Sequence, residues 1–555
     1  MLHAVQDHAG WVSRGALEYA CRRLSIPPAD AYGVASFYAR FALEERPPLA
    51  VHVCDDIACK CAGADALCDA LEKGFGPAGA PGASGSAAWY RSPCLGLCDR
   101  APAALIERAG SRHAEARVAP AGYESLGGIL SGAWPAGDAP MQPPTGSRLL
   151  RRVGVVDPES IDSYLQAGGY GALRRALELG PEGVIREVTD AKLLGRGGAA
   201  FPTGRKWDAV AKASARPHFM VCNADESEPG TFKDRVLMEA DPFAVVEGMT
   251  IAAIATGCEQ GYLYVRTEYP LARERIENSL EQARAKGFLG ADVAGSGLTF
   301  DIEVRRGAGA YICGEETALF NSIEGKRGEP RNKPPFPVAV GLFGKPTLVN
   351  NVETLANVLE ILNHGSAEYA KLGTPESAGT RLFCVSGHVR APGLYEVPMG
   401  TTLRALIQLA GGLREGRSLR AVLLGGAAGS FVTESQLDVP LSFEGTRAIG
   451  ATLGSGAVIV FDDTADLEQV LLRIARFFRD ESCGQCVPCR VGTVRQEEAL
   501  KRILSERNQS LRETDVALLS DIARAMRDAS ICGLGQTAAN AIGSALIQLK
   551  IAGVN

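Results

Sequence analysis

The chain has 555 residues, of which 46% are apolar and 22% charged, and its formal net charge is -6 at pH 7. One hydrophobic core cannot serve a chain of this length, so we expect roughly three to five domains. The slightly acidic, otherwise ordinary composition argues against a protein that binds nucleic acid through a basic excess.

The sequence shows neither a secretory nor a membrane-spanning pattern. The first residues, MLHAVQDH, lack the basic and apolar regions of a signal peptide, and no apolar run reaches the ~18 residues that a membrane span needs. We therefore expect a cytoplasmic protein without direct membrane insertion. The fifteen cysteines are clustered, which in a reducing compartment indicates metal or redox sites rather than disulfides.

The first cysteine cluster follows a helical lead-in. Residues 1–48 read as short helices, because apolar residues recur at helical spacing, and a strand pattern, Leu-Ala-Val-His-Val, then opens the segment 49–132. Two cysteine pairs follow strand-like runs in this segment: Cys54 with Cys59, and Cys94 with Cys98. Thiolates converging from two loops suit a [2Fe-2S] cluster or structural zinc, and cysteines packed as small apolar residues are the remaining interpretation.

This segment, with the motif Gly-Val-Ala-Ser-Phe-Tyr at residues 33–38, resembles the thioredoxin-like [2Fe-2S] ferredoxin of the 24 kDa type found beside the flavoprotein of respiratory complex I. The resemblance implies Cys54, Cys59, Cys94 and Cys98 as the cluster ligands. Cys61 is close enough to confuse the ligand count, whereas we expect Cys21 and Cys68 in the core. Residues 133–150, rich in Pro, Gly and Ala, predict a linker.

A glycine-rich loop near the start of the next predicted domain, residues 151–370, reads GRGGAAFPTGRKW at residues 195–207. Glycine lets the backbone bring N–H groups close to a phosphorylated ligand, and Arg196, Arg205 and Lys206 add positive charge. Taken alone, the loop fits a phosphate cradle and a surface turn about equally, because it lacks a G-x-G-x-x-G pattern between a strand and a helix.

Three further motifs follow this loop. A predicted strand at residues 219–222 ends in Asn-Ala-Asp-Glu-Ser-Glu, where clustered carboxylates perturb each other's pKa and offer acceptors to ribose, ribityl or amide groups; a solvated acidic turn is the alternative. Residues 305–319 place glycines before paired glutamates and a helical pattern. Residues 331–337 form a rigid loop with cations and an aromatic residue, and residues 346–354 open a helix with amides, where Asn350 could also be a simple cap.

In this order the motifs resemble the flavin- and NADH-binding 51 kDa-type subunit of complex I and its relatives in NAD-linked hydrogenases and molybdenum or tungsten formate dehydrogenases. The resemblance runs from about residue 155 to 554. It implies FMN contacts from Gly195, Arg196, Gly197, Gly198, Lys206, Asn223, Asp225, Glu226, Gly314, Glu315, Glu316, Asn350, Asn351 and Thr354. It also implies NAD(H) contacts from Phe201, Glu228, Lys333 and Phe336. Hydride transfer would take place at the flavin, positioned by Glu226 and Glu316, with no acid–base dyad. Some relatives carry an aromatic residue at the position of Ala209, so part of the adenine contact departs from the family pattern.

Two more predicted domains complete the chain. Residues 371–460 read as a small α+β unit similar to the β-grasp (SLBB) domain of the same family. Residues 461–555 are helical by periodicity and carry Cys483, Cys486 and Cys489 on one loop, with Cys532 further on. This three-plus-one pattern indicates a [4Fe-4S] cluster, since zinc usually takes two cysteine pairs. The predicted fold class is therefore multidomain α/β and α+β, with a thioredoxin-like ferredoxin, a Rossmann-like FMN domain, a β-grasp domain and a C-terminal helical bundle.

These cofactors predict a diaphorase, because NAD(H) exchanges paired electrons, clusters exchange single ones, and FMN connects the two. The sequence shows no motif for a second substrate, so we expect a catalytic partner subunit. Fusion of the [2Fe-2S] module to the flavoprotein most resembles the beta subunit of NAD-dependent formate dehydrogenase, whose alpha subunit carries molybdenum or tungsten. The alternative is the NADH dehydrogenase module of complex I or of a bidirectional NAD-linked hydrogenase. An interpretation from another class is a non-enzymatic electron carrier or scaffold with zinc in its cysteine sites.

Overall fold

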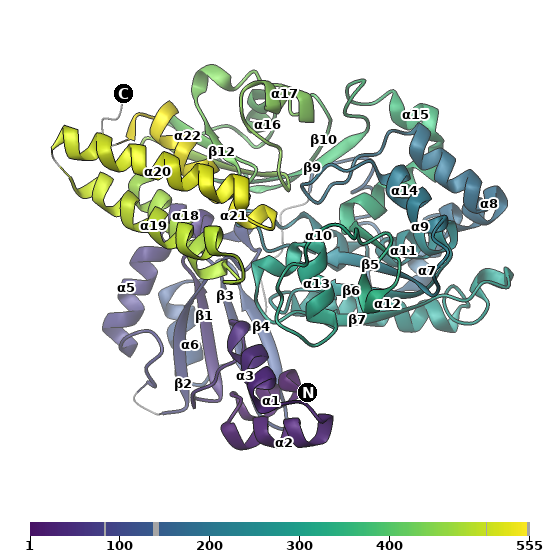
Figure 1. The fold of residues 1–555 in the computed structure, drawn as a ribbon, viewed down its shortest axis with the longest axis horizontal. Coiled ribbons are helices and arrows are strands. Elements are labelled where there is room, and N and C mark those ends of the chain that lie inside the picture. Colours follow the sequence, from purple (N-terminus) through teal and green to yellow (C-terminus); the bar gives the residue numbers. More distant parts are fainter. Residues whose placement is uncertain (83–84, 137–143, 507, 552–555) are drawn as a thin grey trace.

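The computed structural model describes residues 1–82, 85–136, 144–506 and 508–551. The expected multidomain α/β and α+β architecture is confirmed: an N-terminal, a central, a β-grasp and a C-terminal unit follow one another along the chain (Figure 1). Part of the predicted linker at 133–150, residues 137–143, lies outside the described residues. Among the helices that the structure describes, none has the length and apolar character needed to cross a bilayer.

The N-terminal unit begins with three helices, α1 (Leu2–Ala9), α2 (Arg14–Leu24) and α3 (Pro28–Phe37). A four-stranded sheet follows in the order β2-β1-β3-β4. Its strands are β1 (Leu49–Cys54), β2 (Ala87–Ser92), β3 (Ala104–Arg108) and β4 (Ala114–Val118), and only the β1–β2 pair is parallel. The unit also contains the short α4 (Ile57–Cys61) and the longer α5 (Ala64–Phe75) and α6 (Tyr123–Leu130), whose apolar faces pack on the sheet. Cys21 and Cys68 lie in apolar clusters, as expected.

The central unit contains a parallel sheet in the order β7-β6-β5-β8. Its strands are β5 (His218–Ala224), β6 (Cys258–Val265), β7 (Asp301–Arg306) and β8 (Thr347–Asn351). Helices cover it: α7 (Ile161–Gln166), α8 (Gly171–Asp190), α9 (Thr203–Ala211), α10 (Lys233–Ala240), α11 (Pro242–Thr256), α12 (Pro270–Ala285), α13 (Glu316–Ile323), α14 (Val352–His364) and α15 (Ser366–Ala370).

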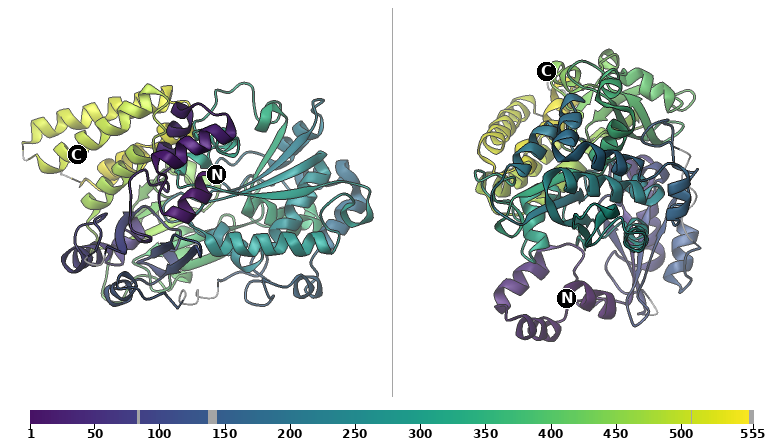
Figure 2. Two further views of the ribbon diagram at one scale, coloured as in Figure 1. Left: turned by 90° about the horizontal axis from the view of Figure 1, so that it is seen from below. Right: turned by 90° about the vertical axis from the view of Figure 1, so that its right-hand side faces the viewer.

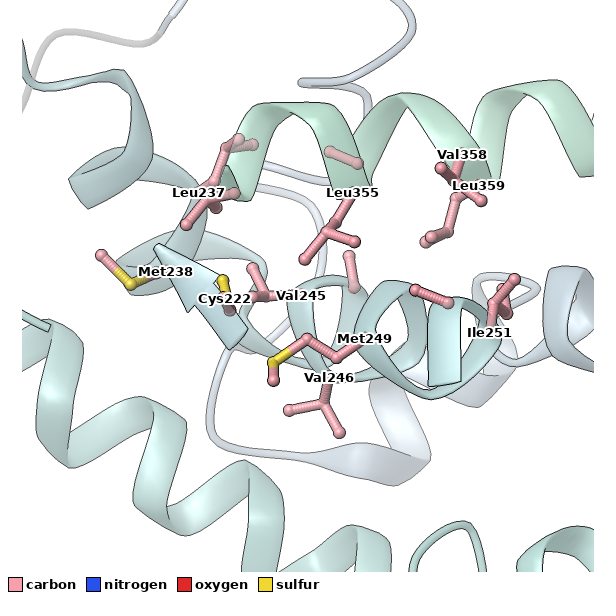
Figure 3. Close-up of a cluster of buried hydrophobic side chains, with 14 of the residues drawn as sticks. Cys222, Leu237, Met238, Val245, Val246, Met249, Ile251, Leu355, Val358 and Leu359 are labelled. Atoms are coloured by element: carbon pink, nitrogen blue, oxygen red, sulfur yellow. The ribbon is translucent and has the colours of Figure 1, made fainter. Parts of the chain in front are cut away.

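Helix α11 forms the middle of this core. All of its residues are buried, which is typical of a helix that is apolar on every side. Figure 3 shows Leu355 and Leu359 of α14 pointing toward α11, where Val245 and Met249 lie. The ideal Cβ of a side chain at Gly248 would lie 3.0 Å from Cβ of Leu355, so glycine lets the two helices approach closely. The tight packing fixes the N-terminus of α14, which borders the candidate site.

The β-grasp unit has a mixed sheet in the order β10-β9-β13-β11-β12. Its strands are β9 (Thr380–Gly387), β10 (Gly393–Pro398), β11 (Leu419–Leu424), β12 (Ser430–Val432) and β13 (Ala457–Asp462), with α16 (Leu403–Leu409) and α17 (Phe443–Ala448) beside them. Only the β9–β13 pair is parallel. Its core is a separate apolar cluster, which supports a folding unit of its own.

The C-terminal unit is helical, as predicted. It consists of α18 (Leu467–Glu481), α19 (Val487–Ser505), α20 (Gln509–Ala529), α21 (Gly533–Thr537) and α22 (Asn540–Gln548). Helix α18 buries one apolar stripe and begins at Asp466, whose side chain accepts a hydrogen bond from the Gln469 N–H. The unit lies beside the β-grasp unit in both views of Figure 2. Ser544 of α22 accepts a hydrogen bond from the Phe431 N–H of β12 and so links the two units.

Candidate functional site

The candidate site lies where the order of the strands in the central parallel sheet reverses. The chain passes from β5 to β6 on one side and later returns as β8 on the other side of β5. In the register of these strands Asn223 lies beside Asn351, and Cys222 beside Asn350. The carboxyl ends of parallel strands at such a switch point form the crevice in which nucleotides bind. The predicted acidic motif and the predicted amide pair therefore meet at one edge.

The glycine-rich loop 195–207 covers the N-terminus of α14 at this edge. The Arg196 N–H donates to Oγ1 of Thr354 at 2.9 Å. An ideal Cβ at Gly197 would lie 3.1 Å from Cβ of Asn351, and Gly198 has a φ of 117°, which favours glycine. A helix N-terminus attracts anions, so the loop backbone and α14 fit the phosphate of a flavin nucleotide.

The side chain of Arg196 does not face this loop, which corrects the expectation that it adds charge there. Its guanidinium is fully buried and donates to the Tyr369 hydroxyl at 3.2 Å and the Ala378 carbonyl at 2.7 Å. Lys206 stays at the edge of β8, where its Nζ donates to the Val349 carbonyl at 3.1 Å and lies 3.9 Å from Glu316. Burial lowers the pKa of Lys206.

The two asparagines of the amide motif have different roles. Oδ1 of Asn350 accepts a hydrogen bond from Nε1 of Trp207 at 2.9 Å, so this residue anchors the end of the glycine-rich loop. Asn351 caps α14 instead, because its Oδ1 accepts from the Glu353 N–H at 3.0 Å. The alternative in which Asn350 is the helix cap is therefore wrong.

The loop after β7 contacts the same edge of the sheet. The Asn223 side-chain amide donates to the Gly314 carbonyl at 2.9 Å, which joins two predicted motifs. Glu315 caps α13 by accepting from the Thr317 and Ala318 N–H groups at 2.8 and 2.9 Å. Nζ of Lys333 then bridges Glu315 and Glu316, at 2.8 and 2.7 Å. Lys333 thus belongs to the same group of side chains as the paired glutamates.

In the acidic motif Glu226 is buried, and Asp225 is half-buried with its Oδ2 out of contact with solvent. Burial raises the pKa of Asp225 to about 8, and its Oδ2 has no hydrogen-bond partner among the described residues. Burial also raises the pKa of Glu226 to about 7, but both oxygens of Glu226 accept from the N-terminus of α10, at 2.9 Å from the Asp234 N–H and 3.0 Å from the Arg235 N–H. Asp225 therefore offers an unpaired polar atom suited to a ligand, whereas Glu226 holds α10 in place.

Glu228 connects the site to the β-grasp unit. Its Oε2 accepts from the Tyr311 hydroxyl at 2.6 Å and its Oε1 from the Ala428 N–H at 3.0 Å. Burial raises the pKa of Glu228 to about 7 in spite of these hydrogen bonds. Neither partner of Glu228 is predicted from the sequence. Tyr311 lies inside the recognised segment 305–319, and Ala428 lies in the run GGAAG at 425–429. An aromatic residue and a glycine-rich run were therefore the signals that could have pointed to these two partners.

The two aromatic residues expected to meet NAD(H) are exposed. Phe201 is 47% and Phe336 57% accessible, which is unusual for phenylalanine and suits stacking on a flat ligand. Arg205 and Lys206 lie 5.9 and 5.8 Å from the centre of the Phe201 ring. Ala209 is exposed on the same helix, α9, so the departure from the family pattern is at the surface.

The four N-terminal cysteines form one buried group. Sγ of Cys94 lies 3.4 Å from Sγ of Cys98, and the Gly96 N–H donates to Sγ of Cys94 at 3.4 Å. Hydrogen bonds from Cys54 and Cys98 lower the pKa of the Cys94 thiol, and Cys54 is also hydrogen-bonded to Cys59. Thiols gathered from two loops fit a [2Fe-2S] cluster. In the described part of the chain no three His, Cys, Asp or Glu side chains surround a single metal-ion position.

The C-terminal cysteines gather at helix N-termini. Cys486 precedes α19, Cys489 lies in its first turn and Cys532 precedes α21. An ideal Cβ at Gly535 would lie 2.9 Å from Cβ of Cys489, so α21 packs directly against the cysteine loop. Helix N-termini favour thiolates, the form that binds iron, and the arrangement fits a [4Fe-4S] cluster.

Tyr311 lies between the switch-point crevice and the C-terminal cysteines. Its hydroxyl donates to Glu228, while its N–H donates to Oε2 of Glu481 at 2.9 Å, two positions before Cys483. Its ring packs edge-to-face on Phe477 of α18, with the ring centres 5.0 Å apart. The loop after β7 therefore contacts both the acidic motif and the C-terminal unit.

Comparison with protein-family models matches each unit. The matches are a thioredoxin-like [2Fe-2S] ferredoxin at residues 1–120, a Nuo51 FMN-binding domain at 188–360, an SLBB domain at 382–428 and an NADH-ubiquinone oxidoreductase-F iron-sulfur binding region at 469–550. They give FMN, NAD(H), a [2Fe-2S] and a [4Fe-4S] cluster as the cofactors. They favour an oxidoreductase subunit over a non-enzymatic scaffold.

Comparison with individual proteins leads to the same family. The F 2 subunit of NADH-quinone oxidoreductase from Rhizobium meliloti (strain 1021) is 45% identical over 400 residues, which cover 72% of this chain and 94% of that protein. The HndC subunit of the NADP-reducing hydrogenase of Solidesulfovibrio fructosivorans is 43% identical over 397 residues, covering 71% and 79%. The crystal structure of an NAD+-reducing [NiFe]-hydrogenase in the air-oxidised state matches with a TM-score of 0.85 and 34% identity, covering 99% of this chain and 92% of that one. The chain belongs to the family of NADH-quinone oxidoreductase F subunits and related NAD-dependent oxidoreductase subunits, here fused to a thioredoxin-like [2Fe-2S] ferredoxin.

Proposed function

We propose that this chain is a diaphorase subunit that passes electrons between NAD(H) and a catalytic partner subunit. The observation that carries the proposal is the convergence of the glycine-rich loop, the acidic motif and the amide pair on the switch point between β5 and β8. When bound there, FMN supplies hydride exchange with NAD(H) and single-electron exchange with iron-sulfur clusters.

The residues of the chain divide this task between positioning and binding. The backbone of residues 195–198 and the N-terminus of α14 would hold the flavin phosphate, and Asp225 would pair with a polar group of the flavin. Exposed Phe201 and Phe336, with Lys333 and Glu228, would bind the nicotinamide nucleotide. We also propose that the remaining predicted residues contact FMN or NAD(H). The proposed domain boundaries divide the chain into segments 1–48, 49–132, 133–150, 151–370, 371–460 and 461–555.

The finer proposal concerns the partner. Fusion of the [2Fe-2S] module to the flavoprotein supports the beta subunit of a formate dehydrogenase, which would reduce NAD+ with electrons from formate oxidised on a molybdenum or tungsten alpha subunit. The matched chain of an NAD+-reducing [NiFe]-hydrogenase extends over the same modules, so an NAD-linked hydrogenase is the second candidate. We place the protein in the cytoplasm, because none of its fifteen cysteines is paired in a disulfide and eight of them are proposed cluster ligands, as suits a reducing compartment.

Purification of the native complex from its source tests both the diaphorase proposal and the proposal about the partner subunit. We expect co-purification of a molybdenum or tungsten subunit and formate-dependent reduction of NAD+. Co-purification of a nickel-iron subunit with hydrogen-dependent NAD+ reduction would identify hydrogen, and not formate, as the electron donor. It would leave the diaphorase proposal intact. A purified chain without flavin and without NADH-dependent reduction of a dye would refute the diaphorase itself.

A further inference from the structure

Two buried arginines of the central unit hold the loop that carries Cys94 and Cys98. Arg266 donates through Nη2 to the Cys94 carbonyl, through Nη1 to the Glu226 carbonyl, both at 2.7 Å, and through Nε to Glu268 at 3.1 Å. Arg235 donates through Nε to the Gly96 carbonyl and through Nη2 to Asp99, both at 2.9 Å. The environment of the N-terminal thiols is thus built partly from the central unit.

The same loop is seated on Tyr269. Gly96 has a φ of 67°, and a side chain there would overlap the Tyr269 hydroxyl, so only glycine permits this approach. The Tyr269 hydroxyl in turn lies 3.1 Å from Oε2 of Glu226, to which it donates. The loop therefore contacts, through Arg266 and through Tyr269, the acidic motif beside the predicted flavin site.

The charge of Arg266 is directed at the loop. Arg266 is only 4% exposed. Among the described residues its guanidinium has one ion-pair partner, Glu268, on its Nε side, while the Cys94 carbonyl lies on its Nη2 side. Although burial raises the pKa of Glu268, Arg266 and Arg40 hold it below its ordinary value, so the carboxylate is ionised. The positively charged group thus contacts the backbone of Cys94 directly, through Nη2.

We propose that Arg266 is a positioning residue of the [2Fe-2S] centre, which fixes the Cys94 loop and raises the reduction potential of the cluster. The inference rests on the proposed function, because it takes the N-terminal thiols to hold that cluster. Reduction adds one electron, and hence one negative charge, to a centre that four thiolates already make negative. A buried cation stabilises this reduced state more than the oxidised one, because the interior screens charge weakly.

An EPR-monitored redox titration of the full-length holoprotein, with dithionite as the reductant, tests the proposal. We expect Arg266→Gln to shift the potential of the [2Fe-2S] signal to a more negative value and Arg266→Lys to keep most of the parent potential. Glu268→Gln should shift it to a more positive value, because the cation then loses its counter-charge. Arg152→Gln is the matched control, since Arg152 is also buried and paired with a carboxylate, Asp241 at 2.8 Å.

Unchanged potentials in Arg266→Gln and Glu268→Gln would overturn the inference, as would an equal negative shift in Arg152→Gln. If Arg266→Gln does not fold, the absence of a positive shift in Glu268→Gln is by itself enough to overturn the inference. A parent protein without any [2Fe-2S] signal would overturn the premise that the N-terminal thiols hold this cluster, and the inference with it, whereas the diaphorase proposal is tested separately by its flavin and its NADH-dependent dye reduction. A parent signal with unshifted variants overturns the inference alone.

Discussion

Glu228 joins a structural contact between two units to the ligand-binding role that we propose for it. Its two oxygens accept from Tyr311 and from the Ala428 N–H, so the β-grasp unit helps to orient a carboxylate of the central unit. Burial raises its pKa to about 7, which places its ionisation inside the physiological range. The binding of a ligand that donates hydrogen bonds to this carboxylate should therefore depend on pH.

Replacement of Glu228 by Gln tests this dependence. Hydroxyl and amide donors of NADH bind the ionised carboxylate better than the protonated one, so in the parent the affinity for NADH should rise with pH through about 7. The variant cannot ionise, and we expect a weaker, pH-independent affinity with bound flavin retained. The loss above pH 7 should be about 1 kcal/mol, or roughly fivefold in Kd.

Fluorescence titration with NADH between pH 6 and 8.5 measures the affinity. Glu178→Gln, an exposed residue of α8, serves as the control and should keep the parent profile. A Glu228→Gln variant with the parent pH profile would exclude Glu228 as the titrating group.

At the scale of elements, α21 forms one wall of the C-terminal cysteine site. Gly535 packs against Ser530 and lies under Cys489, whereas Gly533 at the start of the same helix has open space around it. We expect Gly535→Ala to displace the Cys489 loop and to lower [4Fe-4S] occupancy, with flavin and [2Fe-2S] content unchanged. Overpacking of this kind costs about 1–3 kcal/mol.

Iron analysis and EPR of the purified variant measure the occupancy. Gly533→Ala is the matched control, because its new methyl group would meet no atom within 4 Å. Equal cluster content in the two variants would contradict the role given to Gly535.

The elements also show what the sequence could predict. Strand β5 and its acidic end were predicted, because an apolar run and a change to polar residues are local signals. The direction of the Arg196 side chain was not, because Tyr369 and Ala378, which accept its hydrogen bonds, lie more than a hundred positions away. The contact between Glu228 and Ala428 was missed for the same reason, since it joins two folding units. Asn350 and Asn351 were not told apart, because one residue of register decides which of them caps α14.

At the scale of the whole molecule, the stability should depend on pH through buried carboxyls. Burial raises the pKa of Asp225 to about 8 and of Glu228 and Glu481 to about 7, whereas the unfolded values are about 4. Between these values the folded chain binds more protons than the unfolded one. Below about pH 6.5 these carboxyls are opposed by His3 and His52, whose pKa burial lowers to about 4. Above that pH the carboxyls dominate, and stability falls as the pH rises from about 6.5 to 8, by up to about 1.4 kcal/mol per pH unit for each group.

Thermal unfolding of the purified protein between pH 5 and 8.5 measures this trend. In the flavin-free protein, where Asp225 has no ligand to pair with, Asp225→Asn should flatten the trend and raise Tm above pH 8, because the amide carries no buried charge. Asp208→Asn, at an exposed position of α9, should leave the trend unchanged. A parent Tm that rises with pH from about 6.5 to 8 would contradict the expected sign.

The flavin site and the [4Fe-4S] site belong to different units, and this predicts which activity remains when the [4Fe-4S] cluster is lost. The switch-point crevice and its contacts are formed by the central and β-grasp units, whereas Cys486 belongs to the C-terminal unit. We therefore expect Cys486→Ala to retain NADH-driven reduction of a hydride-accepting dye and to lose electron transfer to the partner subunit. Cys258→Ala, in the buried core of the central unit, is the control that keeps both activities. Partner-coupled turnover that persists in Cys486→Ala would mean that electrons leave the flavin by another route, and the N-terminal thiols would then be the candidate exit.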